Sequence, residues 1–195
     1  MKRVFKVFSM ALCLCLSVAV LTGCGSSAKK TSDNSKDEKV EEKKSKGNCT
    51  VFECIDKLDA KKSLEEVNSI IGFEGTLKSE TESYKVYNWD LTEDTSITVQ
   101  FMTKYGTSII STNFPNSMVD NKADFSKWDE IQTKIKSSTG IKYDEFVELV
   151  GGVKGVMTKK TDTEITYKWI NAKGGFLSAY FKIETGKCSS ASGRF

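Results

Sequence analysis

Two stretches of the sequence, SLEEVNSIIG at residues 63–72 and KYDEFVELVG at residues 142–151, are versions of one pattern. In both, apolar side chains recur every three or four residues, and a glycine follows the last of them. This spacing is typical of an amphipathic helix that stops at the glycine. In the first stretch, Ser63 and Glu66 also have the spacing of a capping box. Both stretches are therefore predicted to be short helices with one buried face.

The similarity continues beyond these helices at a constant offset. Tyr87-Asn88-Trp89 matches Tyr167-Lys168-Trp169, and residues 97–101 match residues 177–181, each time 80 positions later. Apolar and polar side chains alternate along these segments, which predicts antiparallel strands. Agreement over several segments in the same order indicates an internal duplication.

A shorter helical stripe precedes each of the two predicted helices, at residues 51–58 and 128–135. Each copy therefore consists of two helices followed by strands, and we expect the helical pair to cover one face of the strands. We place the copies at residues 49–120 and 121–195. One copy alone would be marginally stable, whereas two packed together bury enough apolar surface to fold.

The second copy resembles a known family. Its segment from Ile131 through Gly140-Ile141 to Gly151 is similar to the helix–loop–helix of the β-lactamase inhibitory protein family, and the resemblance covers residues 50–195. It implies an α+β fold of two tandem repeats, each a helix–loop–helix packed on an antiparallel sheet of about four strands. Small outer-membrane assembly lipoproteins carry a similar single repeat. The first copy departs from the pattern at residues 60–62, where the family has a glycine, and the family's paired cysteines are not matched.

The N-terminus has the organisation of an export signal. Three basic residues lie within the first six, an apolar run follows over residues 7–21, and the run ends in Leu21-Thr22-Gly23-Cys24. The run is short for a membrane-spanning helix and has the length of a signal-peptide core. The last four residues resemble a bacterial lipobox, which implies cleavage after residue 23 and attachment of diacylglycerol, and often of an N-terminal palmitate-like chain, at Cys24. An ordinary secretory signal or a short uncleaved anchor is the alternative.

Residues 24–48 are predicted to be a lipidated cysteine followed by a disordered tether. Only Ala28 and Val40 are apolar between residues 25 and 48, where seven lysines face five acidic residues. Such a composition cannot bury enough apolar surface to offset the entropy of ordering. The tether is a solvated spacer in this interpretation, although its lysines could instead contact anionic headgroups.

Charge and composition exclude several classes of function. The chain has 29 basic and 26 acidic residues and no histidine, and the three extra positive charges all lie in residues 1–23. A neutral mature chain is not expected to bind nucleic acid. Without histidine there is no Ser-His or Cys-His pair, and the usual imidazole ligands of a catalytic zinc site are absent, so neither a metal nor another cofactor is expected. The acidic pairs Glu65-Glu66 and Asp144-Glu145 lie in first helical turns, where they stabilise the helix dipole, and a non-enzymatic protein is predicted.

Three further cysteines remain in the mature chain, Cys49, Cys54 and Cys188. Their spacing does not match a zinc or iron–sulfur site. An extracytoplasmic location permits one disulfide, with three pairings open and one thiol left over.

The strand pattern also suggests a binding surface. Trp89 and Trp169 are expected in the core, so the residues that alternate with them should line the face of the strands away from the helices. Aromatic and methionine side chains are enriched at protein interfaces, and the alternative is that this face is merely solvated. The candidate contact residues are Asn88, Gln100, Met102, Lys168, Tyr180 and Lys182.

These observations predict a lipoprotein on the extracytoplasmic face of a cell membrane, in a Gram-positive envelope, which binds a protein partner through the open face. One alternative is a structural factor in envelope assembly. A more distant one is a carrier of a small ligand or lipid.

Overall fold

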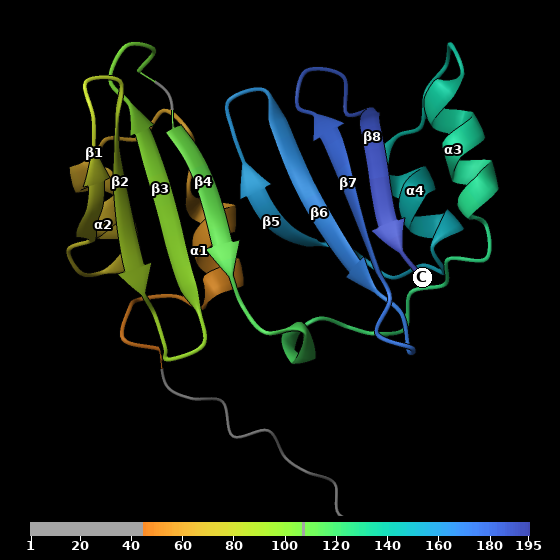
Figure 1. Cartoon of the computed structure of the whole chain (residues 1–195), viewed down its shortest axis with the longest axis horizontal. Coiled ribbons are helices and arrows are strands. Elements are labelled where there is room, and N and C mark those ends of the chain that lie inside the picture. Colours follow the sequence, from red (N-terminus) through yellow and green to blue (C-terminus); the bar gives the residue numbers. More distant parts are fainter. Residues whose placement is uncertain (1–44, 107) are drawn as a thin grey trace, which may run out of the picture. The chain divides into compact units, whose positions relative to one another are not determined.

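The computed structural model describes residues 45–106 and 108–195, shown in colour in Figure 1. The expected signal at residues 1–23, the lipobox with Cys24, and the tether as far as residue 44 lie outside the described residues. The expectations for these segments therefore stay predictions.

Two short helices begin the folded part, as the sequence predicts. They are α1 (Val51–Lys57) and α2 (Leu64–Ile71). The predicted capping box is confirmed, because the Ser63 hydroxyl accepts from the Glu66 amide at 3.3 Å and the Glu66 carboxylate accepts from the Ser63 amide at 2.8 Å. Gly72 ends α2 with a φ of 98°, a left-handed conformation that glycine adopts without strain.

Four antiparallel strands follow these helices, and the same succession then recurs. The first set is β1 (Thr76–Glu80), β2 (Tyr84–Asp90), β3 (Ser96–Met102) and β4 (Ser108–Asn113). After the short 3-10 helix η1 (Asn116–Met118) come α3 (Trp128–Lys136) and α4 (Tyr143–Leu149). The second set is β5 (Val156–Lys160), β6 (Glu164–Ile170), β7 (Phe176–Lys182) and β8 (Cys188–Arg194). Each strand of the second set starts 80 residues after its counterpart.

The prediction of two repeats with a sheet each is wrong. Over the described residues the chain forms one eight-stranded antiparallel sheet, in the order β1 to β8, together with four α-helices (Figure 1). The two sets of strands join where β4 pairs with β5, through Ile110 opposite Lys160 and Ser111 opposite Lys159. As separate sheets, each would expose the unpaired backbone groups of an edge strand at this point, and pairing satisfies those groups.

Side chains reinforce the β4–β5 junction. Thr112 donates from its hydroxyl to the carbonyls of Met157 and Thr158, both at 3.3 Å, and the Lys160 ammonium donates to the Leu58 carbonyl at 2.8 Å. The last bond joins the second set of strands to the loop that follows α1. Side-chain hydrogen bonds from Thr112 in β4 and Lys160 in β5 therefore reinforce the short β4–β5 ladder.

The core consists of two clusters, each built around a tryptophan. Trp89 and Trp169 are fully buried, as predicted. The indole N–H of Trp169 donates to the Val153 carbonyl at 2.8 Å, and that of Trp89 donates to the Phe73 carbonyl at 3.1 Å. Gly75 and Gly155 lie against the two indole rings so closely that a Cβ on either would overlap the ring.

Of the three disulfide pairings left open by the sequence, the structure forms Cys49–Cys54. Cys49 and Cys54 are bonded across the first turn of α1, and Cys188 is a buried free thiol at the start of β8. The bond closes a loop with a sequence separation of 5, so it fixes only the local structure at the start of α1.

Candidate functional site

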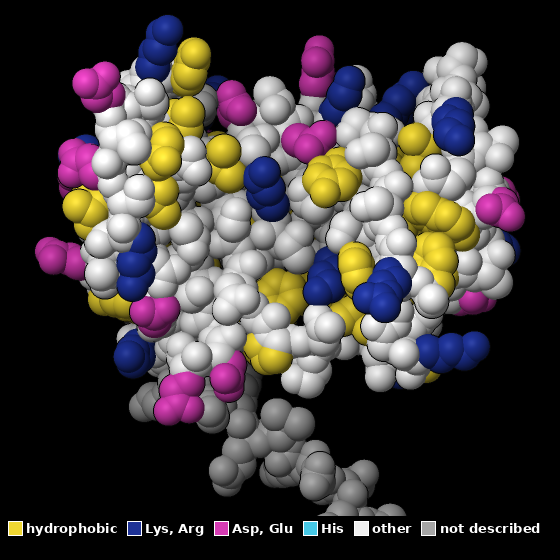
Figure 2. Space-filling model, in the orientation of Figure 1, with side chains coloured by type: hydrophobic (Ala, Val, Ile, Leu, Met, Phe, Trp, Pro, Cys, Tyr) yellow, Lys and Arg dark blue, Asp and Glu magenta, His cyan; other side chains and the backbone are white. Residues whose placement is uncertain are grey.

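All four described α-helices pack on one face of the sheet. Val67 and Ile71 of α2 share a core cluster with Trp89, as do the buried residues of α1. In the second set, α3 and α4 contribute Ile131 and Phe146 to the cluster of Trp169. Because side chains alternate along a strand, the residues between the core positions lie on the opposite face, which we call the open face. Figure 1 shows α1 and α2 behind the first set of strands and α3 and α4 next to β8, and Figure 2 views the molecule from the side of the open face.

The structure places three of the predicted contact residues on the open face of β2 and β3. Asn88 forms hydrogen bonds to its neighbours, accepting from the Thr98 hydroxyl at 2.8 Å and donating to the Asp90 carboxylate at 2.6 Å. Gln100 donates to the Met102 sulfur at 3.3 Å. These contacts within the sheet orient the polar side chains of β2 and β3.

The other three predicted residues lie on the open face of β6 and β7. Lys168 donates from its ammonium to the Asn116 side-chain oxygen at 2.8 Å, and its nitrogen lies 5.7 Å from the centre of the Phe176 ring. Tyr180 is directly opposite Thr166 in β6, and Lys182 is opposite Glu164. The two groups of predicted residues therefore belong to different halves of the sheet, with β4 and β5 between them.

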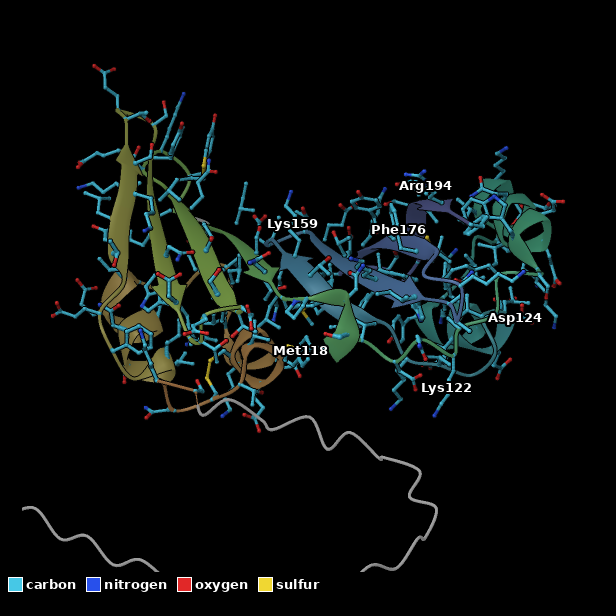
Figure 3. The ribbon with its side chains drawn as sticks, turned by 60° about the horizontal axis from the view of Figure 1, so that its bottom comes forward. Met118, Lys122, Asp124, Lys159, Phe176 and Arg194 are labelled. Carbon is cyan, nitrogen blue, oxygen red and sulfur yellow. A yellow bond between two sulfur atoms is a disulfide. The ribbon has the colours of Figure 1, made fainter. Side chains whose placement is uncertain are left out.

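The sequence interpretation missed three side chains of the same face, Lys159, Phe176 and Arg194, which are labelled in Figure 3. Phe176 is directly opposite Arg194 in β8, and 38% of its surface is exposed. Lys159 pairs with Ser111 at the junction. Alternation along residues 176–182 could have assigned Phe176 to this face, because Phe176 and Tyr180 are four residues apart and such residues point to the same side of a strand. Arg194 and Lys159 had no comparable signal, since their strands show no apolar alternation.

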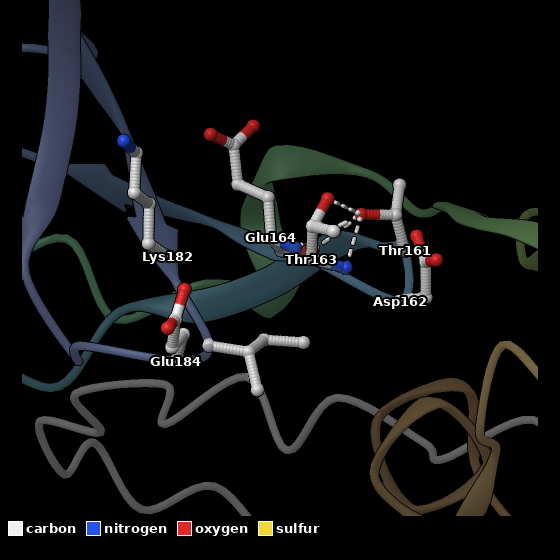
Figure 4. A pocket seen from close by; sticks show the side chains of 7 residues that line it. Thr161, Asp162, Thr163, Glu164, Lys182 and Glu184 are labelled. Atoms are coloured by element: carbon white, nitrogen blue, oxygen red, sulfur yellow. Dashed lines mark hydrogen bonds between the residues drawn. The ribbon is translucent and has the colours of Figure 1, made fainter.

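A polar pocket lies at one end of this half, where the β5–β6 and β7–β8 turns meet (Figure 4). Thr161 shapes the turn, because its hydroxyl accepts from the amides of Thr163 at 3.3 Å and Glu164 at 2.9 Å. Within the described ranges, no group of three or more His, Cys, Asp or Glu side chains is placed to hold a metal ion. The pocket is lined by Thr161, Asp162, Thr163, Glu164, Lys182, Ile183 and Glu184.

The free thiol of Cys188 lies in an environment that does not favour nucleophilic reactivity. Burial raises the pKa of Cys188 to about 11, so the thiol keeps its proton at neutral pH. A buried protonated thiol is a poor nucleophile, because the thiolate is the reactive form. Cys188 therefore behaves as a small core residue beside Phe181, its partner in β7.

Comparisons with known proteins identify no relative of this chain. No family model matches the chain, and neither the curated proteins nor the solved structures contain a match. Within residues 45–106 and 108–195, no helix has the length and apolar character needed to cross a bilayer.

Proposed function

We propose that this chain is a lipid-anchored, extracytoplasmic protein that binds a protein partner through the open face and catalyses no reaction. The observation that carries the proposal is the eight-stranded sheet itself, because each of the four described α-helices packs on the same side of it. The other side presents a continuous surface formed by several strands. Figure 2 shows hydrophobic side chains gathered on this surface over β1–β3, and hydrophobic and basic side chains side by side over β6–β8.

The chemical character of this surface supports a protein partner. Tyr84 lies opposite Met102, and Tyr180 and Phe176 lie on the same face of β7. Aromatic and methionine side chains are enriched at protein interfaces because they bury a large area with little loss of conformational entropy. Serine and threonine between them offer hydrogen bonds to a polar partner without a charge to desolvate.

Site-specific photo-crosslinking in cells that produce the full-length chain tests the proposed face. A benzophenone-bearing amino acid replaces Gln100 or Tyr180 on the open face, and Glu65 on the exposed side of α2 is the matched control position. We expect the same protein to be captured from both open-face positions and not from Glu65. Equal capture from all three positions, or none from the open face, contradicts the proposal.

The anchor is tested separately, because it rests on the sequence of residues 1–24 alone. Cells grown with labelled palmitate should transfer the label to the full-length chain, and the Cys24→Ala variant should lack it. A labelled Cys24→Ala variant, or an unlabelled natural chain, overturns the lipoprotein assignment.

A further inference from the structure

The two halves of the open face differ in charge. On β2, β3 and β4 the strand alternation leaves one charged side chain on this face, Asp90. On the corresponding strands β6, β7 and β8 it leaves three basic side chains and one acidic side chain, Glu164. The basic side chains are Lys168, Lys182 and Arg194.

Phe176 lies between two of these cations. Lys168 is 5.7 Å from the centre of its ring, a distance at which a cation interacts with the face of an aromatic ring, and Arg194 is directly opposite in β8. Figure 3 shows Phe176 and Arg194 on the same side of the sheet. Neighbouring strands are about 4.8 Å apart, and Lys168 on β6 is level with Ser192 of β8, two positions before Arg194, so the two basic residues begin about 12 Å from each other. We call these three residues the cationic strip.

The charges of the cationic strip are not neutralised within the described residues. None of the ion pairs in residues 45–106 and 108–195 includes either cation of the strip, Lys168 or Arg194. The hydrogen-bond acceptor of Lys168 is the neutral amide of Asn116, which orients the ammonium without cancelling its charge. A positive potential therefore remains over β6–β8 for an anionic ligand.

The acidic end of the same half limits how wide that ligand can be. Asp162, Glu164 and Glu184 lie together at the tips of the hairpins, at the opposite end of the strands from Phe176 and Arg194 (Figure 4). A broad anionic surface such as a bilayer would meet these carboxylates together with the cationic strip. A single extended chain can lie on the strip and avoid them. An apolar side chain of a peptide can also contact Phe176, which a polyphosphate chain cannot do.

We propose that the cationic strip binds an extended acidic segment of the protein partner, in which two carboxylates flank an apolar side chain. In an extended chain, residues i, i+2 and i+4 point to the same side at intervals of about 7 Å. Carboxylates at i and i+4 can therefore reach Lys168 and Arg194 through these long, flexible side chains, while the side chain at i+2 faces the ring between them. The apolar side chain lies against Phe176. This inference rests on the proposed function, because it names the chemistry of the partner at that same face.

Selection from a randomised library of 12-residue peptides tests this inference on the full-length chain held in mild detergent. We expect the enriched peptides to contain at least two Asp or Glu residues around an apolar residue. A labelled enriched peptide should then bind at least about tenfold more weakly to the Lys168→Glu/Arg194→Glu variant, and more weakly at high salt. Phe176→Ala should also weaken binding, whereas Phe176→Tyr should retain most of it.

A matched variant separates the strip from the general charge of the protein. Lys61→Glu/Lys104→Glu makes the same change in net charge at exposed positions outside the strip, and it should leave binding unchanged. Equal weakening in both double variants, enrichment of peptides without acidic residues, or no enrichment at all overturns the inference. So does tighter binding of inorganic polyphosphate or of phosphatidylglycerol vesicles than of the peptide, since the ligand would then be another polyanion. A partner crosslinked at Tyr180 that lacks acidic segments would contradict this inference and leave the proposed function standing.

Discussion

The two halves of the sheet have the same succession of strands but stabilise it differently. The helices of the first half are held locally: α1 and α2 each begin with a complete capping box, and α1 carries the Cys49–Cys54 disulfide. Neither α3 nor α4 has a side-chain N-cap. They are held by contacts with the sheet and with each other, and these contacts involve residues distant in sequence. One arrangement of strands can therefore be maintained either by local interactions or by tertiary packing.

The packing of the second half centres on a group of aromatic rings. Phe146 stacks on Trp169 with ring centres 4.9 Å apart and meets the edge of Phe181 at 5.5 Å. Tyr143 lies 4.5 Å from Tyr167 and contacts the same tryptophan. In the first half, the position that corresponds to Phe146 is Val67, also buried. The second half thus buries more aromatic surface under its helices.

The largest expected effect comes from removing this aromatic packing. Phe146→Ala should lower the free energy of unfolding by about 3–5 kcal/mol, because it leaves a cavity against Trp169 and Phe181. Val67→Ala, the matched change in the first half, removes two methyl groups and should cost about 2 kcal/mol. Urea denaturation followed by tryptophan fluorescence measures both changes. A smaller loss for Phe146→Ala than for Val67→Ala would contradict the proposed difference between the halves.

The disulfide should contribute an intermediate amount, and only in the first half. For a loop as short as that between Cys49 and Cys54, the restriction of the unfolded chain corresponds to about 2 kcal/mol. The Cys49→Ala/Cys54→Ala variant should therefore unfold at a lower urea concentration than the natural chain under oxidising conditions. Reductant should remove most of this difference by destabilising the natural chain, and it should not affect the variant. If the natural chain is unchanged by a reductant that demonstrably breaks the bond, the disulfide does not contribute to the free energy of unfolding.

The smallest effect on the free energy of unfolding at neutral pH is expected at a position where the two halves carry different small residues. Ser108 in β4 corresponds to Cys188 in β8, and both are buried. The pKa of Cys188 is raised from its ordinary value of 9.0 to about 11 by burial, so the unfolded chain loses this proton at a lower pH than the folded one. The stability that the protonated thiol gives the folded chain is fully present below pH 9 and is lost as the pH rises through 11, by up to about 3 kcal/mol.

Cys188→Ser removes this titration and makes the second half resemble the first. The difference in unfolding free energy between the natural chain and the variant should be constant from pH 6 to pH 8 and should shift in favour of the variant between pH 9 and pH 11. Unfolding curves collected across this range measure the shift. A constant difference at every pH would show that Cys188 ionises with its ordinary pKa in the folded protein.

Local features of the fold could be predicted from the sequence because they depend on neighbouring residues. The stripes at residues 63–72 and 142–151 became α2 and α4, and the alternating segments around Trp89 and Trp169 became β2 and β6. The burial of both tryptophans followed from the same alternation. The pairing of strand edges from the two halves could not be predicted. The pairing of Ile110 with Lys160 joins residues 50 positions apart, and neither sequence pattern nor composition specifies which edges meet.

The candidate site could be predicted in part for the same reason. Lys168 and Tyr180 were assigned to the open face because they alternate with Trp169 and Ala179 in recognisable strands. Arg194 was missed because β8 consists mostly of serine and glycine and shows no apolar alternation. A usable signal for the core was overlooked: Gly75 and Gly155 also differ by 80 positions, and both lie against a tryptophan ring that leaves no room for a side chain.

The short β4–β5 ladder has a mechanical consequence. If the chain is held to a surface at its N-terminus and a partner pulls on β6–β8, tension must cross from the first half of the sheet to the second. It passes through the two residue pairs between β4 and β5, the hydrogen bonds of Thr112 and the bond from Lys160 to Leu58. Every other neighbouring pair of strands is joined by more residue pairs than this one. Under force, the junction is therefore where the sheet would open first, and it sets the largest pull that the anchored protein can withstand before its halves separate.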